Sequence, residues 1–158
     1  MAGQGYWYLV EESISGQRVE QSLWQQFLLW RCGVWQYGGF LQSLKYKDIE
    51  EQRHICRLSG KEAKRMTTAS WQEDQTVWWK GQTIDRQSKM FLRLVRAAYK
   101  AMFEQNESFR TALMSTCGKV LYHSQGAQDS HKTILTEKEF CSILTELRDN
   151  EKKYYNGV

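Results

Sequence analysis

The stretch that decides the fold is SKMFLRLVRAAYKAMFEQ, residues 88–105. Its apolar side chains recur at helical spacing, and its basic side chains lie on the opposite side. The apolar set is Phe91, Leu94, Val95, Ala98, Met102 and Phe103, and the basic set is Arg93, Arg96 and Lys100. We therefore predict an amphipathic helix over 88–105 that buries its apolar face.

Two further helices are predicted downstream of this stretch. One spans 108–116 and ends before Gly118, which we expect as its C-cap in the left-handed conformation. The other begins at Thr136, which forms a capping box with Glu139 three residues on. Its expected buried residues are Phe140, Ile143, Leu144 and Leu147. Between the two helices, residues 120–122 are predicted as a short strand.

Upstream of residue 88 the signals are weaker. Ser59 and Glu62 form a capping box that predicts a short helix over 60–66. Residues 40–56 are helix-like but interrupted by charge. Residues 67–88 are polar around their tryptophans, and we expect an ordered loop with one helical turn.

Nearer the N-terminus, the aromatic run 6–10 predicts a strand, and the apolar spacing over 19–30 predicts a helix. Gly33, Gly38 and Gly39 are interpreted as punctuation after that helix. The chain contains no proline, so nothing of that kind interrupts its helices. The whole pattern predicts a mainly α, multihelical single domain over 1–158, with one or two short strands.

Composition limits the compartment and the partners. The longest apolar cluster, 27–30, is far shorter than the roughly 20 residues of a membrane span. The N-terminus has neither the pattern of a signal peptide nor Gly at position 2. Cys32, Cys56, Cys117 and Cys141 have no Cys-x-x-Cys spacing, so we expect four buried thiols. These features predict a soluble protein of a reducing, cytoplasmic compartment, with no membrane partner.

The net charge of +4 is compatible with phosphate-bearing ligands or nucleic acid, but supports neither strongly. Lys61, Lys64 and Arg65 form the densest basic cluster, which a solvated helix face explains equally well.

Several motifs occur together in a fixed order. They are VRAAYKAMFEQNESFRTALMSTCG at 95–118, LQSLKY at 41–46, AKRM at 63–66 and FCSILTELR at 140–148. Over roughly 36–149 this order resembles the NADAR (YbiA-like N-glycosidase) family. The resemblance implies a mainly helical fold that cleaves N-glycosidic bonds, in riboflavin-pathway intermediates or in ADP-ribosyl adducts of bases.

The resemblance also implies that much of the family's catalytic apparatus is missing. Gly38 and Gly39 stand where the family has a Glu-His pair, and Asp129 lacks the Trp-Gly that follows it in the family. The Gly-x-Asn-x-Leu-Gly loop before the last helix is replaced by 136–141.

Gln42 and Lys45 match the family. The resemblance implies that Lys45 is a phosphate contact or an amine nucleophile, with Gln42 beside it. Asp129, or one of Glu11 and Glu12, would then replace the missing acid. The alternative is that Gln42 and Lys45 lie on a solvated helix face.

Other candidate residues have an ordinary interpretation beside a functional one. Trp71, Trp78 and Trp79 either pack over the core or form a protein interface, with stacking on bases a weaker option. His54, His123 and His131 have no metal-ligand spacing, and we expect ordinary roles for them, with no metal and no cofactor.

Three functions follow from the sequence. The first is a non-catalytic or catalytically degraded NADAR-like domain, acting as a binding or structural subunit with a protein partner in a larger assembly. The second is a divergent N-glycosidase acting on an ADP-ribosyl or ribosyl-phosphate bond. The third, weaker, is a silent domain that still binds an ADP-ribose-like nucleotide.

Overall fold

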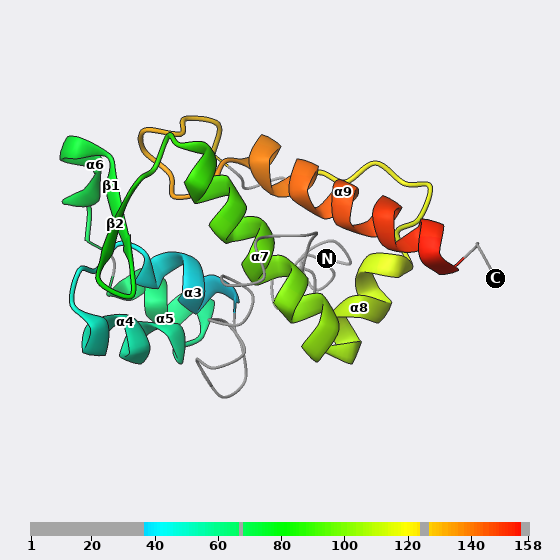
Figure 1. The fold of residues 1–158 in the computed structure, drawn as a ribbon, viewed down its shortest axis with the longest axis horizontal. Coiled ribbons are helices and arrows are strands. Elements are labelled where there is room, and N and C mark those ends of the chain that lie inside the picture. The colour runs from blue at the N-terminus through cyan, green and yellow to red at the C-terminus, as the bar shows by residue number, and fades with distance from the viewer. Residues whose placement is uncertain (1–36, 67, 124–126, 156–158) are drawn as a thin grey trace.

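The computed structural model describes residues 37–66, 68–123 and 127–155 (Figure 1). Within them the chain forms seven helices and one two-stranded antiparallel sheet, which confirms the predicted mainly α fold with short strands. The strand predicted over 6–10 and the helix predicted over 19–30 lie outside the described residues. None of the described helices is both long and apolar enough to cross a membrane.

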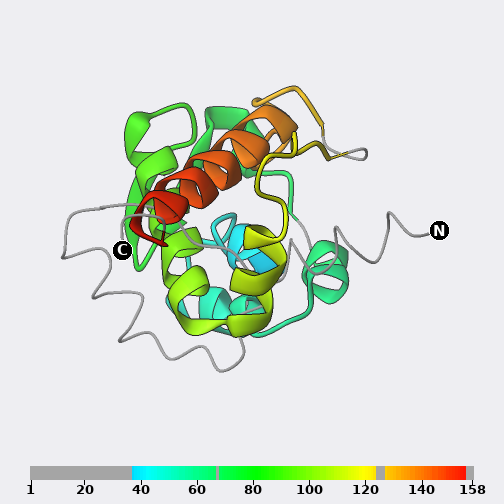
Figure 2. The same cartoon turned by 90° about the vertical axis from the view of Figure 1, so that its right-hand side faces the viewer.

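The central element is helix α7, Lys89–Gln105, as the opening stretch of sequence predicted. Its N-cap is Ser88, whose hydroxyl accepts the backbone N–H of Phe91 at 3.2 Å. The six predicted apolar side chains are all buried, and Ala97, Tyr99 and Ala101 are buried as well. The buried arc is therefore wider than a single amphipathic stripe, because α7 is covered from several sides (Figures 1 and 2).

Helices α8, Glu107–Met114, and α9, Glu137–Tyr155, follow α7. The capping box at Thr136 is confirmed, since its hydroxyl accepts the N–H of Glu139 and its own N–H donates to the Glu139 carboxylate. The predicted buried face of α9 is confirmed too. Gly118, with φ of 79°, provides the left-handed turn after α8. The strand prediction for 120–122 is wrong, because no described strand pairs with that segment.

Three short helices gather on the side of α7 away from α9: α3, Tyr37–Ser43, α4, Ile49–Cys56, and α5, Gly60–Arg65 (Figure 1). The interruption expected within 40–56 is real, and Asp48 restarts the chain as the N-cap of α4, accepting two backbone N–H groups. The capping box of Ser59 and Glu62 at α5 is also confirmed.

The loop predicted over 67–88 is wrong in one respect, because it contains a β-hairpin. Helix α6, Trp71–Asp74, leads into strands β1, Thr76–Trp79, and β2, Gln82–Asp85. The turn residues Lys80 and Gly81 both have positive φ, 49° and 80°, which is typical of the tight hairpin turn usually built by Asn-Gly. A lysine in the first turn position concealed that signal.

Gly39 explains how α3 fits against the end of α4. A Cβ atom at this position would lie 2.7–2.8 Å from the carbonyl oxygens of Ile55, Cys56 and Leu58. The interpretation of Gly38 and Gly39 as punctuation is wrong, since both lie inside α3. Glycine is required at 39 because another stretch of backbone approaches it closely.

We expect Gly39→Ala to lower the free energy of unfolding by about 2 kcal/mol, because the new methyl group overlaps backbone oxygens that cannot rotate away. Helix propensity alone would favour alanine by about 1 kcal/mol, so the sign of the change separates the two effects. Urea unfolding followed by circular dichroism measures it.

Gly118→Ala is the comparison for this test. Nothing lies within 4 Å of a Cβ at Gly118, so only its positive φ opposes alanine, at about 1 kcal/mol. A neutral or stabilising Gly39→Ala would contradict the close approach of α3 to the end of α4.

Candidate functional site

An open groove of ≈ 530 Å³ lies between α9 and the segment 119–121 that follows α8. We call it the α9 groove. Its lining residues are Lys119, Val120, Leu121, Gln128, Glu137, Lys138, Cys141, Ser142, Thr145 and Arg148. This volume lies within the range of known binding pockets, roughly 300–1,000 Å³.

The α9 groove carries a surplus of positive charge. The carboxylate of Glu137 is occupied inside the protein, since it accepts the backbone N–H of His123 at 2.9 Å and the side-chain amide of Gln128. The side chains of Lys119 and Lys138 are exposed, and no ion pair joins either to another described residue. The groove therefore presents two uncompensated ammonium groups.

Arg148 fixes one wall of the groove. Its guanidinium is buried and donates to the carbonyl oxygens of Thr116 and Lys119, both at 2.8 Å, and to Asp149 at 2.9 Å. These bonds satisfy carbonyls beyond the C-terminus of α8 that the helix itself leaves unpaired. Segment 119–121 is therefore held beside α9 by a cation that is itself fully engaged.

The segment also exposes apolar surface. Val120 is 91% exposed and Tyr122 61% exposed, whereas Leu121 between them is buried. In the sequence the three residues are all apolar, so the alternation of exposed and buried side chains could not be predicted from it. The strand prediction for 120–122 did not indicate a groove, nor the roles of Lys119 and Lys138.

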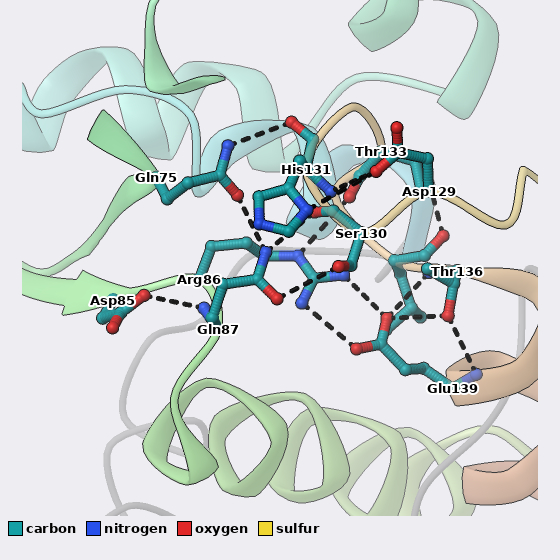
Figure 3. A network of polar contacts seen from close by, with 11 residues as sticks. Gln75, Asp85, Arg86, Gln87, Asp129, Ser130, His131, Thr133, Thr136 and Glu139 are labelled. Carbon is teal, nitrogen blue, oxygen red and sulfur yellow. Dashed lines mark hydrogen bonds and ion pairs between the residues drawn. The ribbon is translucent and has the colours of Figure 1, made fainter. Parts of the chain in front are cut away.

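The N-terminus of α9 is anchored by an ion pair between the buried Arg86 and the half-buried Glu139 (Figure 3). Arg86 is 1% exposed and binds the carboxylate of Glu139 through two nitrogens, at 3.1 and 2.7 Å. The guanidinium also lies 4.4 Å from the centroid of the Phe91 ring. Burial raises the pKa of Glu139, but the hydrogen bonds from Arg86 and Thr136 lower it by more. The pKa of Glu139 therefore lies below its ordinary value.

Glutamine side chains hold the loop 128–135 beside this ion pair (Figure 3). Gln75 donates to the carbonyl of His131, and Gln72 to that of Lys132. Gln87 donates to the carbonyl of Ser130 and accepts its hydroxyl. These bonds join the loop to α6 and to the turn before α7, on the path to α9.

Lys45 and Gln42, the residues predicted as site remnants, are 9% and 6% exposed. The alternative of a solvated helix face is therefore wrong for both. The Lys45 ammonium lies 5.8 Å from the centroid of the Trp71 ring, and no described residue forms an ion pair with it. Burial, with the charge of Lys64 second, lowers the pKa of Lys45 from 10.5 to about 8.

Asp129, the third predicted site residue, is not paired with Lys45. Its carboxylate accepts the backbone N–H of His131 at 2.9 Å and lies 3.8 Å from the Lys132 ammonium. Trp71 and Trp79 are 0% and 2% exposed and belong to the core, so packing is the correct interpretation of these two. Trp78 is half-buried against that core, and Glu11 and Glu12 lie outside the described residues.

The described cysteines are free thiols, with Cys56 buried and Cys117 and Cys141 half-buried. Cys32 lies outside the described residues. Burial, followed by the charge of Glu137, raises the pKa of Cys141 to about 11, so this thiol stays protonated. In the part of the chain that the structure describes, no three His, Cys, Asp or Glu side chains could hold a metal ion.

Comparison with known proteins identifies the family. The family model of bacteriophage protein GP30.3 matches residues 23–149. A protein of Enterobacteria phage T4, described as an uncharacterized 17.1 kDa protein in the Gp30-rIII intergenic region, is 40% identical over 121 residues. That alignment covers 73% of this chain and 80% of the relative. No solved structure matches the chain. The chain belongs to the bacteriophage protein GP30.3 family.

The resemblance to the NADAR family is therefore wrong, and with it the expectation of an N-glycosidase fold. The motifs that suggested it are short helical segments, in which apolar and small residues recur for packing reasons alone. Two expectations rested only on that resemblance and are withdrawn with it. They are the ADP-ribose-like ligand and the loss of a Glu-His pair at Gly38 and Gly39.

We expect Glu139→Gln to lower the free energy of unfolding by about 3 kcal/mol, because it leaves the Arg86 guanidinium buried without a counter-charge. The pKa of Glu139 is lower in the folded state, so its contribution is present above pH 4.5 and is lost as pH falls through the folded value. Urea unfolding between pH 3 and 7 measures both effects.

Glu146→Gln is the matched control for that test, since Glu146 pairs with Arg96 at 3.2 Å on the surface. Exposed pairs contribute about 0–1 kcal/mol. Equal losses in the two variants would show that the Arg86 pair has no special role.

We expect the contribution of Lys45 to the stability of the native chain to grow as pH rises from about 8 to 10.5, whereas Cys141, with its raised pKa, contributes in the opposite direction above pH 9. Unfolding restores the ordinary pKa of Lys45, so between these values the unfolded state binds more protons and a higher pH favours folding. Lys45→Met should stabilise the protein by up to about 3 kcal/mol at pH 7 and flatten this rise. Urea unfolding across the pH range tests this, with Lys47→Met, an exposed neighbour, as control. The same pH dependence of stability in Lys45→Met and Lys47→Met would contradict the role of Lys45.

Proposed function

We propose that this member of the bacteriophage protein GP30.3 family is a binding subunit of a larger assembly, and that its α9 groove holds an extended, acidic segment of a protein partner. The observation that carries the proposal is the pair of uncompensated lysines, Lys119 and Lys138, in an open groove beside the exposed side chain of Val120.

Charge supports an acidic partner. The acidic side chain in the groove, Glu137, is engaged by His123 and Gln128, whereas the two ammonium groups face solvent. A partner carboxylate near each ammonium makes the electrostatic potentials of the two surfaces complementary. Such pairs accelerate association and select against basic partners.

Backbone geometry supports an extended partner. The N–H groups of Val120 and Leu121 donate no hydrogen bond to a described residue, and the side chains from 120 to 122 alternate between exposed and buried. An extended peptide lying alongside such a segment pairs with its backbone and places every second side chain in the groove. Ser142 and Thr145 on α9 supply hydroxyl groups along the facing wall.

The test uses a fluorescein-labelled peptide, Glu-Val-Glu-Val-Glu-Val, and measures its binding by fluorescence anisotropy at 50 mM NaCl. We expect the double variant Lys119→Glu/Lys138→Glu to bind at least about tenfold more weakly, since each lost charge pair costs on the order of 1 kcal/mol. The control is Lys152→Glu/Lys153→Glu, which makes the same charge change on α9 outside the groove.

Three results would contradict the proposal. They are an equal loss of affinity in the control variant, equal binding of the peptide Lys-Val-Lys-Val-Lys-Val, and unchanged binding by Val120→Asp. The first result would show that the peptide responds only to the general surface charge. The third would show that the segment 119–121 is not part of the binding surface.

A further inference from the structure

We propose that the exposed basic face of α5, together with Arg57 just before the helix, binds the phosphate backbone of double-stranded DNA without regard to base sequence. We call this surface the α5 basic face, and its residues are Arg57, Lys61, Lys64 and Arg65. It is separate from the α9 groove, whose lining includes none of the four residues.

The nine residues 57–65 hold most of the excess charge of the chain. They contain four basic side chains and one carboxylate, a net charge of +3, whereas the whole chain of 158 residues has a net charge of +4. The charges of the other residues therefore almost balance. A basic cluster of this kind is the electrostatic footprint of a nucleic-acid-binding surface.

Helical spacing places three of these side chains on the same face of α5. Lys61, Lys64 and Arg65 occupy positions i, i+3 and i+4, which are neighbours on the surface of a helix. Ala63, on the other side of the helix, is fully buried. The three basic side chains are exposed, and so is that of Arg57. The packing of α5 against α3 therefore turns the positive charges towards solvent (Figure 1).

The described part of the protein leaves these charges uncompensated. Arg57, Lys64 and Arg65 form no ion pair with a described residue. The carboxylate of the segment, Glu62, is engaged in the capping box, where it accepts the backbone N–H of Ser59 at 3.0 Å. The hydrogen bonds with Ser59 are the main cause that lowers the pKa of Glu62, and the charge of Arg65 comes last.

The electrostatics of the helix itself explain only part of this arrangement. Lys64 and Arg65 lie in the last turn of α5, where the helix dipole favours positive charge. Lys61 lies in the first turn, where the dipole opposes positive charge. A ligand with negative charges spaced along the helix accounts for the basic residues at both ends.

The spacing of the face matches a DNA strand. Residues 61 and 65 are about 6 Å apart along the axis of α5. Each strand of a DNA duplex carries one phosphate per about 3.4 Å of its axis, so the two side chains can contact neighbouring phosphates. Such contacts depend on the backbone alone and carry no information about the base sequence.

Other anionic partners fit the α5 basic face less well. Proteins that bind single strands stack the bases on aromatic side chains, and α5 has no aromatic residue. Duplex RNA is recognised largely through its 2′-hydroxyl groups, and lysine and arginine side chains offer no acceptor for them. A helix that binds membranes needs an exposed apolar face, whereas the exposed apolar side chain at α5 is that of its C-cap, Met66.

The experiment measures binding of a fluorescein-labelled 20-bp DNA duplex to the whole chain by fluorescence anisotropy, from 50 to 200 mM NaCl. We expect a Kd in the range of about 1–100 µM, equal for two duplexes of unrelated sequence. Lys64→Gln/Arg65→Gln should weaken binding at least about tenfold. It should also lower the slope of log K against log[NaCl] by about 2, since each phosphate contact contributes about 0.9.

The matched control is Lys152→Gln/Lys153→Gln, which removes the same charge from the last turn of another helix, α9. This control should bind DNA as the native chain does. Lys64→Arg/Arg65→Lys keeps both positive charges and should also retain the native affinity. Together the two controls separate a loss of charge on α5 from a loss of charge anywhere on the surface.

Four results would overturn the proposal. They are the absence of binding at 50 mM NaCl, an equal loss of affinity in the α9 control, an equal loss in Lys119→Gln/Lys138→Gln, and a loss in the variant that keeps both charges. The third result would place the DNA in the α9 groove instead. Equal or tighter binding of single-stranded DNA, of duplex RNA or of vesicles of anionic lipid would also overturn it.

Discussion

The rest of the described structure depends on one ion pair, that between the buried Arg86 and the half-buried Glu139. The guanidinium is almost entirely enclosed, so the fold must bring it a carboxylate and hold that carboxylate in place. Glu139 meets this need while also capping the first turn of α9 through Thr136. The start of α9 is thereby tied to the turn before α7. Because α9 is one wall of the groove, the groove's position follows from this pair.

Elements whose signals are local could be predicted from sequence. Helix α7 follows from its apolar spacing, and the starts of α5 and α9 follow from capping boxes completed within four residues. The hairpin was missed because its turn uses Lys80 where the familiar signal has asparagine. The role of Gly39 was missed because the backbone that approaches it lies 16 to 19 residues further along the chain.

The candidate sites could be predicted only in part, for the same reason. Lys45 and Gln42 were selected by a family resemblance that is wrong, and their burial contradicts the surface position that sequence favours for such residues. Arg86 and Arg148 were not selected at all. Their partners lie 53 and 32 residues away, and no local pattern reveals which charged residue will be enclosed. The α9 groove likewise exists only after α8 and α9 have packed.

The buried cations differ in whether they connect segments of the fold. Among the described residues three cations are at least nine-tenths buried: Arg86, Arg148 and Lys45. Arg86 has a bidentate carboxylate, and Arg148 has two carbonyls and Asp149. Both arginines hold distant segments together, and their burial is explained by those bonds. Lys45, by contrast, joins no segments through hydrogen bonds. Its burial beside Lys64 lowers the stability of the folded protein. The two buried guanidinium groups therefore connect segments of the fold, whereas the buried ammonium group of Lys45 opposes folding.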